Sequence, residues 1–189
     1  NFKKYNWDHA LDELENFNYF HYSCPNCQSR DRERLYAIFL NDYIEKSTQP
    51  SLSILDFAPS RQFIHFMNNI GKKYSKSIIY RTADLYSEEV DDKIDISNMS
   101  LYSDNKFDLI ICSHILEHVE DDSKALKELL RVLKPEGKAI LMVPILLSIN
   151  DIDEDPAEKN ECERWRRFGQ NDHVRQYSKN GFIERIKNA

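Results

Sequence analysis

A short polar string near the C-terminal end of the chain carries residues suited to acid–base chemistry. Residues 168–175 read FGQNDHVR and directly follow the basic string RWRR. The imidazole of His173 titrates near neutral pH, so with Asp172 beside it in sequence it is a candidate general base. The same two residues could equally hold the loop in place by capping the following helix.

Two cysteines near the N-terminus have the spacing of half a zinc knuckle. Cys24 and Cys27 enclose Pro25 and Asn26, but no second pair of cysteines follows at a similar spacing. A structural zinc site needs four ligands, and His9 and His21 could supply the missing two. The alternative is a turn that carries two free thiols, and on this reading the chain has no metal site.

Acidic and polar residues also follow the predicted strands. Asp84 comes just after a strand at 77–82, Asp95 lies in a short strand at 93–96, and Ser113 and His114 follow a strand at 107–112. The carboxyl ends of parallel strands form the edge where open α/β sheets bind ligands, so function should be sought there. Asp84 could instead be a turn residue that caps the next segment.

The stretch between residues 101 and 145 predicts how these residues are positioned. Apolar runs at 107–112 and 139–143 have no helical period and read as strands buried on both faces. Between them Leu126, Leu129 and Leu133 recur at helical spacing, and Lys134-Pro135 with Gly137 ends the helix. The strand-helix-strand unit, with further strands at 53–57 and 77–82, predicts an α/β fold with a Rossmann-like, doubly wound, mainly parallel sheet.

The same stretch resembles a known family. The string FDLIICSHILEHVEDDSKALKELLRVLKPEGKAILMVPI looks like the fourth strand, helix and fifth strand of a class I S-adenosylmethionine-dependent methyltransferase of the type 11-like group. The FGQ-x-DHVR string is similar to one found in a subgroup of these enzymes. The resemblance implies that S-adenosyl-L-methionine is the cofactor and S-adenosyl-L-homocysteine the product.

The resemblance also implies which residues bind the cofactor. Asp84 would accept hydrogen bonds from both ribose hydroxyls, Asp95 would contact the adenine amino group, and Arg30 or Arg34 could reach the cofactor carboxylate or an anionic acceptor. The full set of implied cofactor-binding residues is Asp56, Phe57, Ala58, Pro59, Ser60, Asp84, Leu85, Asp95, Ile96, Ser113, His114, Leu116, His118 and Arg30. His118 could instead be simply packed and hydrogen-bonded, and Arg30 could belong to a solvated face.

The loop after the first strand departs from the usual pattern. Adenosyl sites normally place glycines there, whereas this chain reads Asp56-Phe57-Ala58-Pro59-Ser60. Ala58 has the next smallest side chain, Pro59 fixes the turn, and Ser60 can cap the helix that follows. A subgroup of the family resembles this with an A-P-E or A-P-S turn, whereas a nicotinamide dinucleotide fingerprint would need glycines.

The predicted elements divide the chain into an N-terminal helical lid with the C-x-x-C turn, residues 1–48, and a methyltransferase domain, residues 49–189. The lid is expected to contain a helix in which Trp7, Leu11, Leu14 and Phe17 share one face. We expect strand order 3-2-1-4-5, with the last two strands of the family missing. The exposed edge of the fifth strand would then be covered by another chain, such as a homo-oligomer partner, or the protein is truncated.

Composition limits the partners and the compartment. The net charge of −6 makes nucleic acid an unlikely partner, because binding to phosphate backbones depends on clustered Lys and Arg. No apolar stretch is long enough for a membrane span, and the four cysteines are not evenly spaced, which favours the reducing cytoplasm.

Two functions remain open from the sequence. The first is a methyltransferase whose acceptor is a small molecule or a glycan precursor. The second is a degenerate, non-catalytic methyltransferase fold-mate that binds a cofactor or a partner, which the missing glycines and strands would suit.

Overall fold

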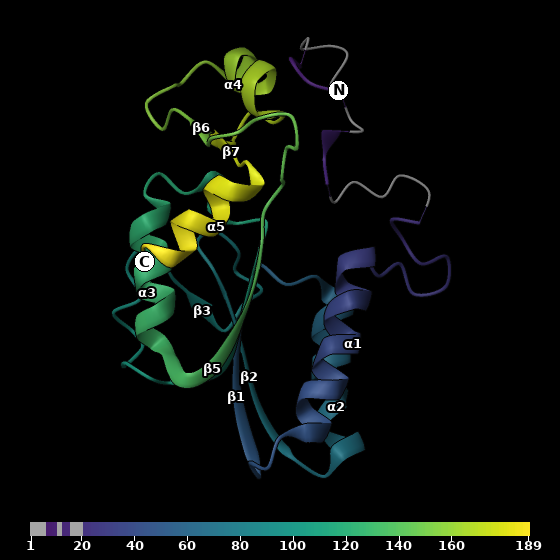
Figure 1. Ribbon diagram of the computed structural model, residues 1–189. Coiled ribbons are helices and arrows are strands. Elements are labelled where there is room, and N and C mark those ends of the chain that lie inside the picture. The colour runs from purple at the N-terminus through teal and green to yellow at the C-terminus, as the bar shows by residue number, and fades with distance from the viewer. Residues whose placement is uncertain (1–6, 11–12, 16–20) are drawn as a thin grey trace.

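A five-stranded parallel sheet forms the centre of the protein in the computed structural model, which describes residues 7–10, 13–15 and 21–189 (Figure 1). The strand order is β3-β2-β1-β4-β5 and all four neighbouring pairs are parallel. This confirms the predicted fold class and strand order. The strands are β1 (Ser51–Phe57), β2 (Ser77–Asp84), β3 (Asp92–Lys93), β4 (Phe107–Ser113) and β5 (Leu133–Met142).

Helices cover both faces of the sheet. Helices α1 (Asp31–Lys46) and α2 (Arg61–Tyr74) pack on one face, and α3 (Asp122–Val132) and α5 (Lys179–Lys187) pack on the other (Figure 1). Alternate residues of β1 point into the two resulting cores: Ile54 belongs to the core under α1 and α2, and Leu55 to the core under α3. Burial on both faces explains why the central strands read as continuous apolar runs.

Polar caps set where two of these helices begin. The Ser60 hydroxyl accepts a hydrogen bond from the Phe63 N–H at 3.1 Å, as predicted, and Asp121 accepts one from the Lys124 N–H at 2.9 Å. These bonds satisfy backbone donors that have no partner inside the helix. The helix α3 ends at Val132, just before Lys134-Pro135, as its sequence indicates.

Some boundaries differ from prediction. The third strand is only Asp92–Lys93, so Asp95 lies in the turn after it rather than inside a strand. The apolar pattern through Phe63, Phe66 and Met67 predicts a helix that ends at Gly71, but α2 continues to Tyr74 and is capped by Ser75, whose φ of 52° is left-handed.

The composition of the acidic stretch at 150–163 predicts a loop, and the structure corrects this prediction. The stretch contains β6 (Asp153–Glu154), which pairs antiparallel with β7 (Arg175–Gln176), and it leads into α4 (Glu161–Phe168). Gly169 ends α4 with a φ of 79°, a left-handed conformation that suits glycine. The pair β6–β7 with α4 forms a strap that crosses the carboxyl end of the sheet beside α5 (Figure 1).

The helix expected in the N-terminal region falls largely on residues outside the described part of the chain, including Leu11 and Phe17. The residues described there do not form an α-helix. Leu14 forms an antiparallel bridge with Leu146, and the Glu15 N–H donates to the Ile145 carbonyl at 3.0 Å. This segment therefore packs along the chain just after β5.

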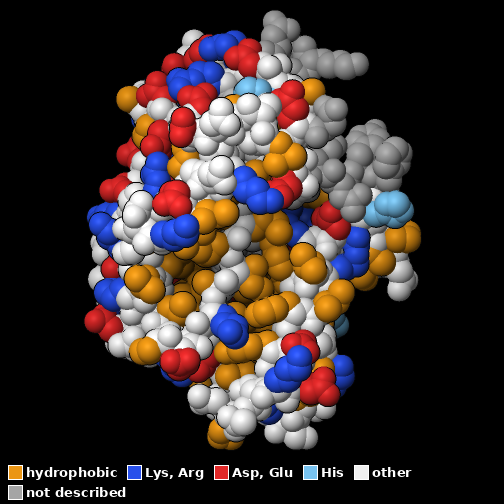
Figure 2. Space-filling model, viewed as in Figure 1, with side chains coloured by type: hydrophobic (Ala, Val, Ile, Leu, Met, Phe, Trp, Pro, Cys, Tyr) orange, Lys and Arg blue, Asp and Glu red, His pale blue; other side chains and the backbone are white. Residues whose placement is uncertain are grey.

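The sheet ends at β5, as predicted. Hydrophobic side chains gather on the face of the molecule where β5 forms the edge (Figure 2). Leu130 and Ile183, on the two helices beside β5, are 59% and 42% exposed. A homo-oligomer partner over this edge remains a prediction. Among the described residues, no helix combines the length and apolar character needed to cross a bilayer.

Candidate active site

The carboxyl ends of β1 and β4 carry two residues with left-handed backbone conformations. Ala58 follows β1 with a φ of 49°, and His114 follows β4 with a φ of 58°. The two strands are neighbours in register, with Phe57 opposite Cys112. Non-glycine residues rarely adopt positive φ, and such residues cluster at functional sites. The two strand ends therefore turn sharply away from the sheet and leave a gap between their loops.

Ala58 stands where a glycine is usual, and it adopts the conformation for which glycine is normally selected. Its N–H donates to the Ala83 carbonyl at the end of β2, at 2.9 Å. Asp56 lies two residues earlier, is 2% exposed, and accepts a hydrogen bond from the Tyr80 hydroxyl at 2.7 Å. Burial raises the pKa of Asp56 to about 7, although the bond from Tyr80 works in the opposite direction.

Asp84, at the end of β2, acts as a turn residue, which was the alternative role predicted for it. Its Oδ1 atom accepts hydrogen bonds from the backbone N–H groups of Tyr86 and Ser87, at 2.6 and 2.7 Å. In this arrangement Oδ2 can still accept a hydrogen bond from a ligand. Leu85, which comes next, is 43% exposed at the rim.

Asp95 lies in the turn after β3. It is exposed, and its Oδ1 atom accepts the Ser97 N–H at 2.7 Å. Ile96 beside it is buried, with its side chain in the core under α3.

The N-terminal end of α1 lies over the space between the loops that follow β1 and β4. The Tyr36 hydroxyl is 2.8 Å from the Ser113 Oγ, which fixes α1 above β4. Arg30 immediately precedes α1 and lines the same small cavity as Ala58 and Ser113. Arg34 has a different role, because it donates to the carbonyls of Ser29 and His21 and so holds the C-x-x-C turn.

The C-x-x-C turn carries free thiols. The Cys27 sulfur lies 3.1 Å from the Ser29 hydroxyl, and this hydrogen bond lowers the pKa of the exposed thiol. Within the described part of the chain, no His, Asp or Glu joins Cys24 and Cys27 in a group of three metal ligands.

A cavity of about 900 Å³ opens beside the strand ends. Its walls come from the end of β4, the segment after β5, the region around α4, the start of α1 and the N-terminal segment. Among the lining residues are Arg30, His114, Glu117, His118, Met142, Pro144, His173 and Gln176. A smaller cavity of about 30 Å³ shares Arg30 with it and is lined by Asp56, Phe57, Ala58, Pro59, Ser60 and Ser113. Asp84 and Asp95 line neither cavity.

One wall of the large cavity is a short 3-10 helix, η2 (Leu116–His118). Glu117 is 1% exposed, and its Oε1 atom lies 3.1 Å from His114 Nδ1. His118 packs edge-to-face against His173 with ring centroids 4.7 Å apart. Leu116 is fully buried, so its side chain lies in the core and not in the cavity.

His173 is 5% exposed and lines the cavity beside His118, and Asp172 is not its partner. The Asp172 carboxylate lies 3.3 Å from His118 Nδ1, whereas His173 Nδ1 is 3.0 Å from the Phe168 carbonyl. Burial lowers the pKa of His173, so its imidazole is neutral at physiological pH. The alternative role as a helix cap does not apply, because β7 follows His173 and Ser178 caps α5 through the Gly181 N–H.

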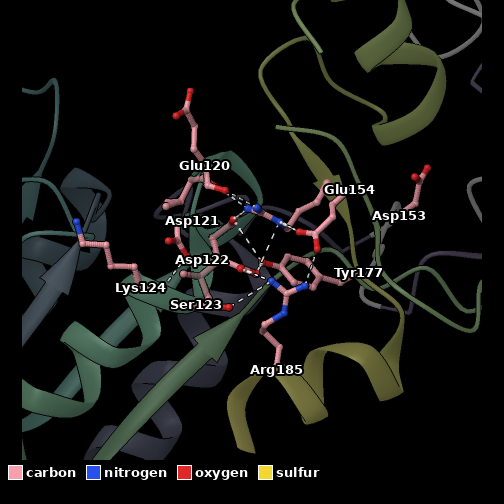
Figure 3. A network of polar contacts seen from close by, with 12 residues as sticks. Glu120, Asp121, Asp122, Ser123, Lys124, Asp153, Glu154, Tyr177 and Arg185 are labelled. Carbon is pink, nitrogen blue, oxygen red and sulfur yellow. Dashed lines mark hydrogen bonds and ion pairs between the residues drawn. The ribbon is translucent and has the colours of Figure 1, made fainter. Parts of the chain in front are cut away.

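A buried network of charges fixes the strap that carries His173 (Figure 3). Arg175, 1% exposed, donates to the carbonyls of Leu116, Val119 and Glu120 and to the Glu154 carboxylate. Glu154 and the buried Asp122 both pair with Arg185 of α5, and the Tyr177 hydroxyl donates to Asp122 at 2.6 Å. The Val174 N–H also donates to the Glu117 carbonyl at 2.9 Å. The strap is thus bonded directly to η2.

Comparison with known proteins agrees with this architecture. Residues 66–141 match the family model described as methyltransferase domain. The chain has the fold of a class I methyltransferase. This agrees with the resemblance seen in the sequence for the stretch that contains β4, α3 and the first part of β5. No curated protein sequence matches the chain.

Three solved methyltransferase structures share the fold. The trans-methyltransferase CalH in complex with SAH aligns with a TM-score of 0.51 at 16% identity, over 84% of this chain and 51% of CalH. The CMeT domain of the citrinin polyketide synthase aligns at 0.57 and 13% identity, over 88% and 47%. The CurJ carbon methyltransferase aligns at 0.56 and 10% identity, over 82% and 46%. The chain therefore spans about half the length of these proteins.

Proposed function

We propose that the protein is a methyltransferase that binds S-adenosyl-L-methionine at the carboxyl ends of β1 to β4 and releases S-adenosyl-L-homocysteine. The observation that supports this most is the pair of left-handed residues, Ala58 and His114, at the ends of two adjacent parallel strands beside a cavity of about 900 Å³. The match of residues 66–141 to a methyltransferase domain and the SAH bound to CalH agree with it.

The missing glycine does not argue against this function. Ala58 already has the conformation that the turn needs, and its methyl group is exposed rather than buried in the gap. The alternative of a degenerate fold-mate was based on this residue and on the missing strands, and the first of these arguments no longer applies.

In the proposed complex, each part of the cofactor has a suitable partner. Asp84 Oδ2 accepts from the ribose, the backbone from Asp56 to Ser60 turns beneath the sulfonium, and Arg30 faces the methionine carboxylate. The turn from Leu85 to Ile96, with Asp95, borders the adenine, and the loop from Ser113 to His118 closes the other side.

The acceptor would occupy the large cavity. In methyl transfer its nucleophilic atom attacks the methyl carbon and the neutral thioether leaves, so the protein mainly aligns the two molecules and excludes water. The acceptor that we predict is a small molecule or a glycan precursor. For a hydroxyl acceptor, His173 is the predicted base, with Asp172 acting only through His118. The cytoplasm, where the four free thiols would stay reduced, is the predicted compartment.

Calorimetry with the variant Asp84→Asn tests the cofactor site. Asparagine keeps the oxygen that accepts the Tyr86 and Ser87 N–H groups, but it replaces Oδ2 by an NH2 group that cannot accept from the ribose. Loss of two hydrogen bonds to a charged acceptor predicts S-adenosyl-L-homocysteine affinity at least about 100-fold lower.

Asp91→Asn is the matched control, because Asp91 also ties down this loop, through the Thr82 N–H at 2.8 Å and the Thr82 hydroxyl. Its affinity for the same ligand should equal that of the wild type. If Asp84→Asn binds as tightly as Asp91→Asn, Asp84 does not hold the ribose.

A further inference from the structure

Three side chains from two distant parts of the chain converge on one point of the large cavity. Glu117 and His118 come from η2, and His173 comes from the strap before β7. Each offers one ligand atom, and these atoms all lie within 4.8 Å of one another. Two imidazole nitrogens and one carboxylate oxygen are a ligand set typical of protein-bound divalent transition metals.

One polar atom of each side chain already has a partner. The Glu117 Oε1 atom faces His114 Nδ1, His118 Nδ1 faces the Asp172 carboxylate, and His173 Nδ1 faces the Phe168 carbonyl. In the tautomers that these acceptors favour, Nδ1 of both His118 and His173 carries the proton and Nε2 keeps its lone pair. Metal-binding histidines are commonly oriented by this kind of bond from the second ring nitrogen.

The remaining oxygen of Glu117 lacks a partner. The side chain is 1% exposed, and Oε2 is buried without a hydrogen bond to any described residue. An unpartnered buried carboxylate oxygen is costly, and such atoms are rare in folded proteins. A cation beside Oε2, between Glu117 and the two imidazoles, would supply the missing interaction.

We propose that Glu117, His118 and His173 bind one divalent first-row transition-metal ion. Metal–ligand bonds of about 2.1 Å place tetrahedral ligand atoms about 3.4 Å apart, so the 4.8 Å cluster must contract by little more than 1 Å. Side-chain rotation can provide this contraction at the cavity wall. Calcium and magnesium are poorer candidates, because they prefer sites made only of oxygen atoms.

Three protein ligands leave at least one coordination position open, and all three residues line the cavity. The open position would bind an oxygen atom of the methyl acceptor, a point that depends on the proposed function, whereas metal binding itself does not. A hydroxyl bound there would lose its proton to water more readily. Its oxygen would then form the bond to the methyl carbon while the carbon–sulfur bond breaks. In that case His173 is a metal ligand and not the base.

Titration of the metal-stripped protein with Zn²⁺ tests the site, with Co²⁺ absorption reporting the ligand types. Because Cys24 and Cys27 could also bind Zn²⁺, the reference protein is the Cys24→Ser/Cys27→Ser variant. It should bind one Zn²⁺, and its Co²⁺ spectrum should lack thiolate charge-transfer bands. Adding Glu117→Gln, which keeps the shape and an acceptor for His114, should weaken Zn²⁺ binding at least about 30-fold.

Two further variants keep the result interpretable. Asp172→Asn, which removes the negative charge beside His118 and keeps an oxygen for Gln170, should weaken binding about tenfold. His118→Gln should weaken Zn²⁺ binding as much as Glu117→Gln does. Because His118 is half-exposed, its substitution carries the smaller risk to folding. Thermal melting without metal verifies that each variant is folded.

The proposal is overturned if the Cys24→Ser/Cys27→Ser protein binds no Zn²⁺, or if Glu117→Gln and His118→Gln bind it as tightly as their parent. Binding of S-adenosyl-L-homocysteine, measured without metal on the same proteins, reports separately on the proposed function. If the wild type does not bind S-adenosyl-L-homocysteine, the proposed cofactor site is wrong, but the proposed metal site is not affected.

Discussion

Replacing Arg175 by methionine tests whether buried charges hold the strap against η2. The guanidinium donates to three backbone carbonyls and to Glu154, all from a side chain that is 1% exposed. Methionine has a similar length but no donor, so the three carbonyls would lose this donor, although the Leu116 carbonyl would keep the Tyr177 hydroxyl at 3.4 Å. Asp122 and Glu154 would keep Arg185, so neither carboxylate would be left alone.

The expected cost follows from these contacts. Each hydrogen bond lost from the charged guanidinium costs about 1 kcal/mol or more, and the broken pair with Glu154 adds to this, so the free energy of unfolding should fall by about 3–5 kcal/mol. For a chain of this length, that corresponds to a melting temperature about 10 °C lower. With a urea m-value near 2 kcal/mol/M, the midpoint should move down by about 2 M.

Urea unfolding followed by circular dichroism measures this directly. Arg61→Met is the matched control, because Arg61 pairs with Glu89 at 2.6 Å, closer than the 3.1 Å between Arg175 and Glu154, but is 80% exposed, and its midpoint should not change. Arg175→Lys should recover only part of the loss, since one ammonium group cannot reach three carbonyls at once. A midpoint for Arg175→Met equal to that of Arg61→Met would refute the idea that this network stabilises the strap.

Two further predictions concern the loop after β1. The pKa of Asp56 is raised from its ordinary value of 3.8 to about 7, so its contribution to stability is complete below about pH 4 and is lost as the pH rises through 7. The stability of the wild type relative to Asp56→Asn should therefore fall by on the order of 4 kcal/mol between pH 4 and 8, and parallel urea-midpoint curves would contradict this. Ala58→Val should lower stability by about 1–2 kcal/mol in thermal melts, because a β-branched residue fits poorly at a φ of 49°, whereas Ala58→Gly should not; equal melting temperatures would show that the turn is unstrained.

The position of the strand ends, where the cofactor site is proposed, could be predicted from the sequence because it depends on local rules. Parallel strands place their carboxyl ends at one edge, so the residues after β1, β2 and β4 had to meet. The cap at Ser60 and the end of α3 before Pro135 are similarly local, since each depends on residues within one turn. The positive φ of Ala58 could not be predicted, because it follows from the path of the chain and not from the residue type.

The part of the candidate site that the strap and η2 form, where the acceptor is proposed to bind, could not be predicted in the same way. Asp122 reads as one more acid at a helix start, yet it lies buried between Tyr177 and Arg185. Nothing in the sequence pairs residues so far apart, and the acidic stretch before α4 has the composition of a solvated loop. The burial of Glu117 was not predicted for a related reason: an isolated acid in an apolar string gives no sign of whether it is buried. Its apolar neighbours Leu116 and Val119 were the available signal.

The two halves of the site are thus stabilised by different forces. The strand ends are fixed by the ladder of the sheet and by two apolar cores, which tolerate little change. The strap is fixed mainly by Arg175, Arg185 and their carboxylates, whose bonds are directional and depend on a few atoms each. A substitution in the strap can therefore reshape the cavity around His173 while leaving the strand ends unchanged. For a protein of this fold, that separation would allow the methyl acceptor to change without loss of the cofactor site.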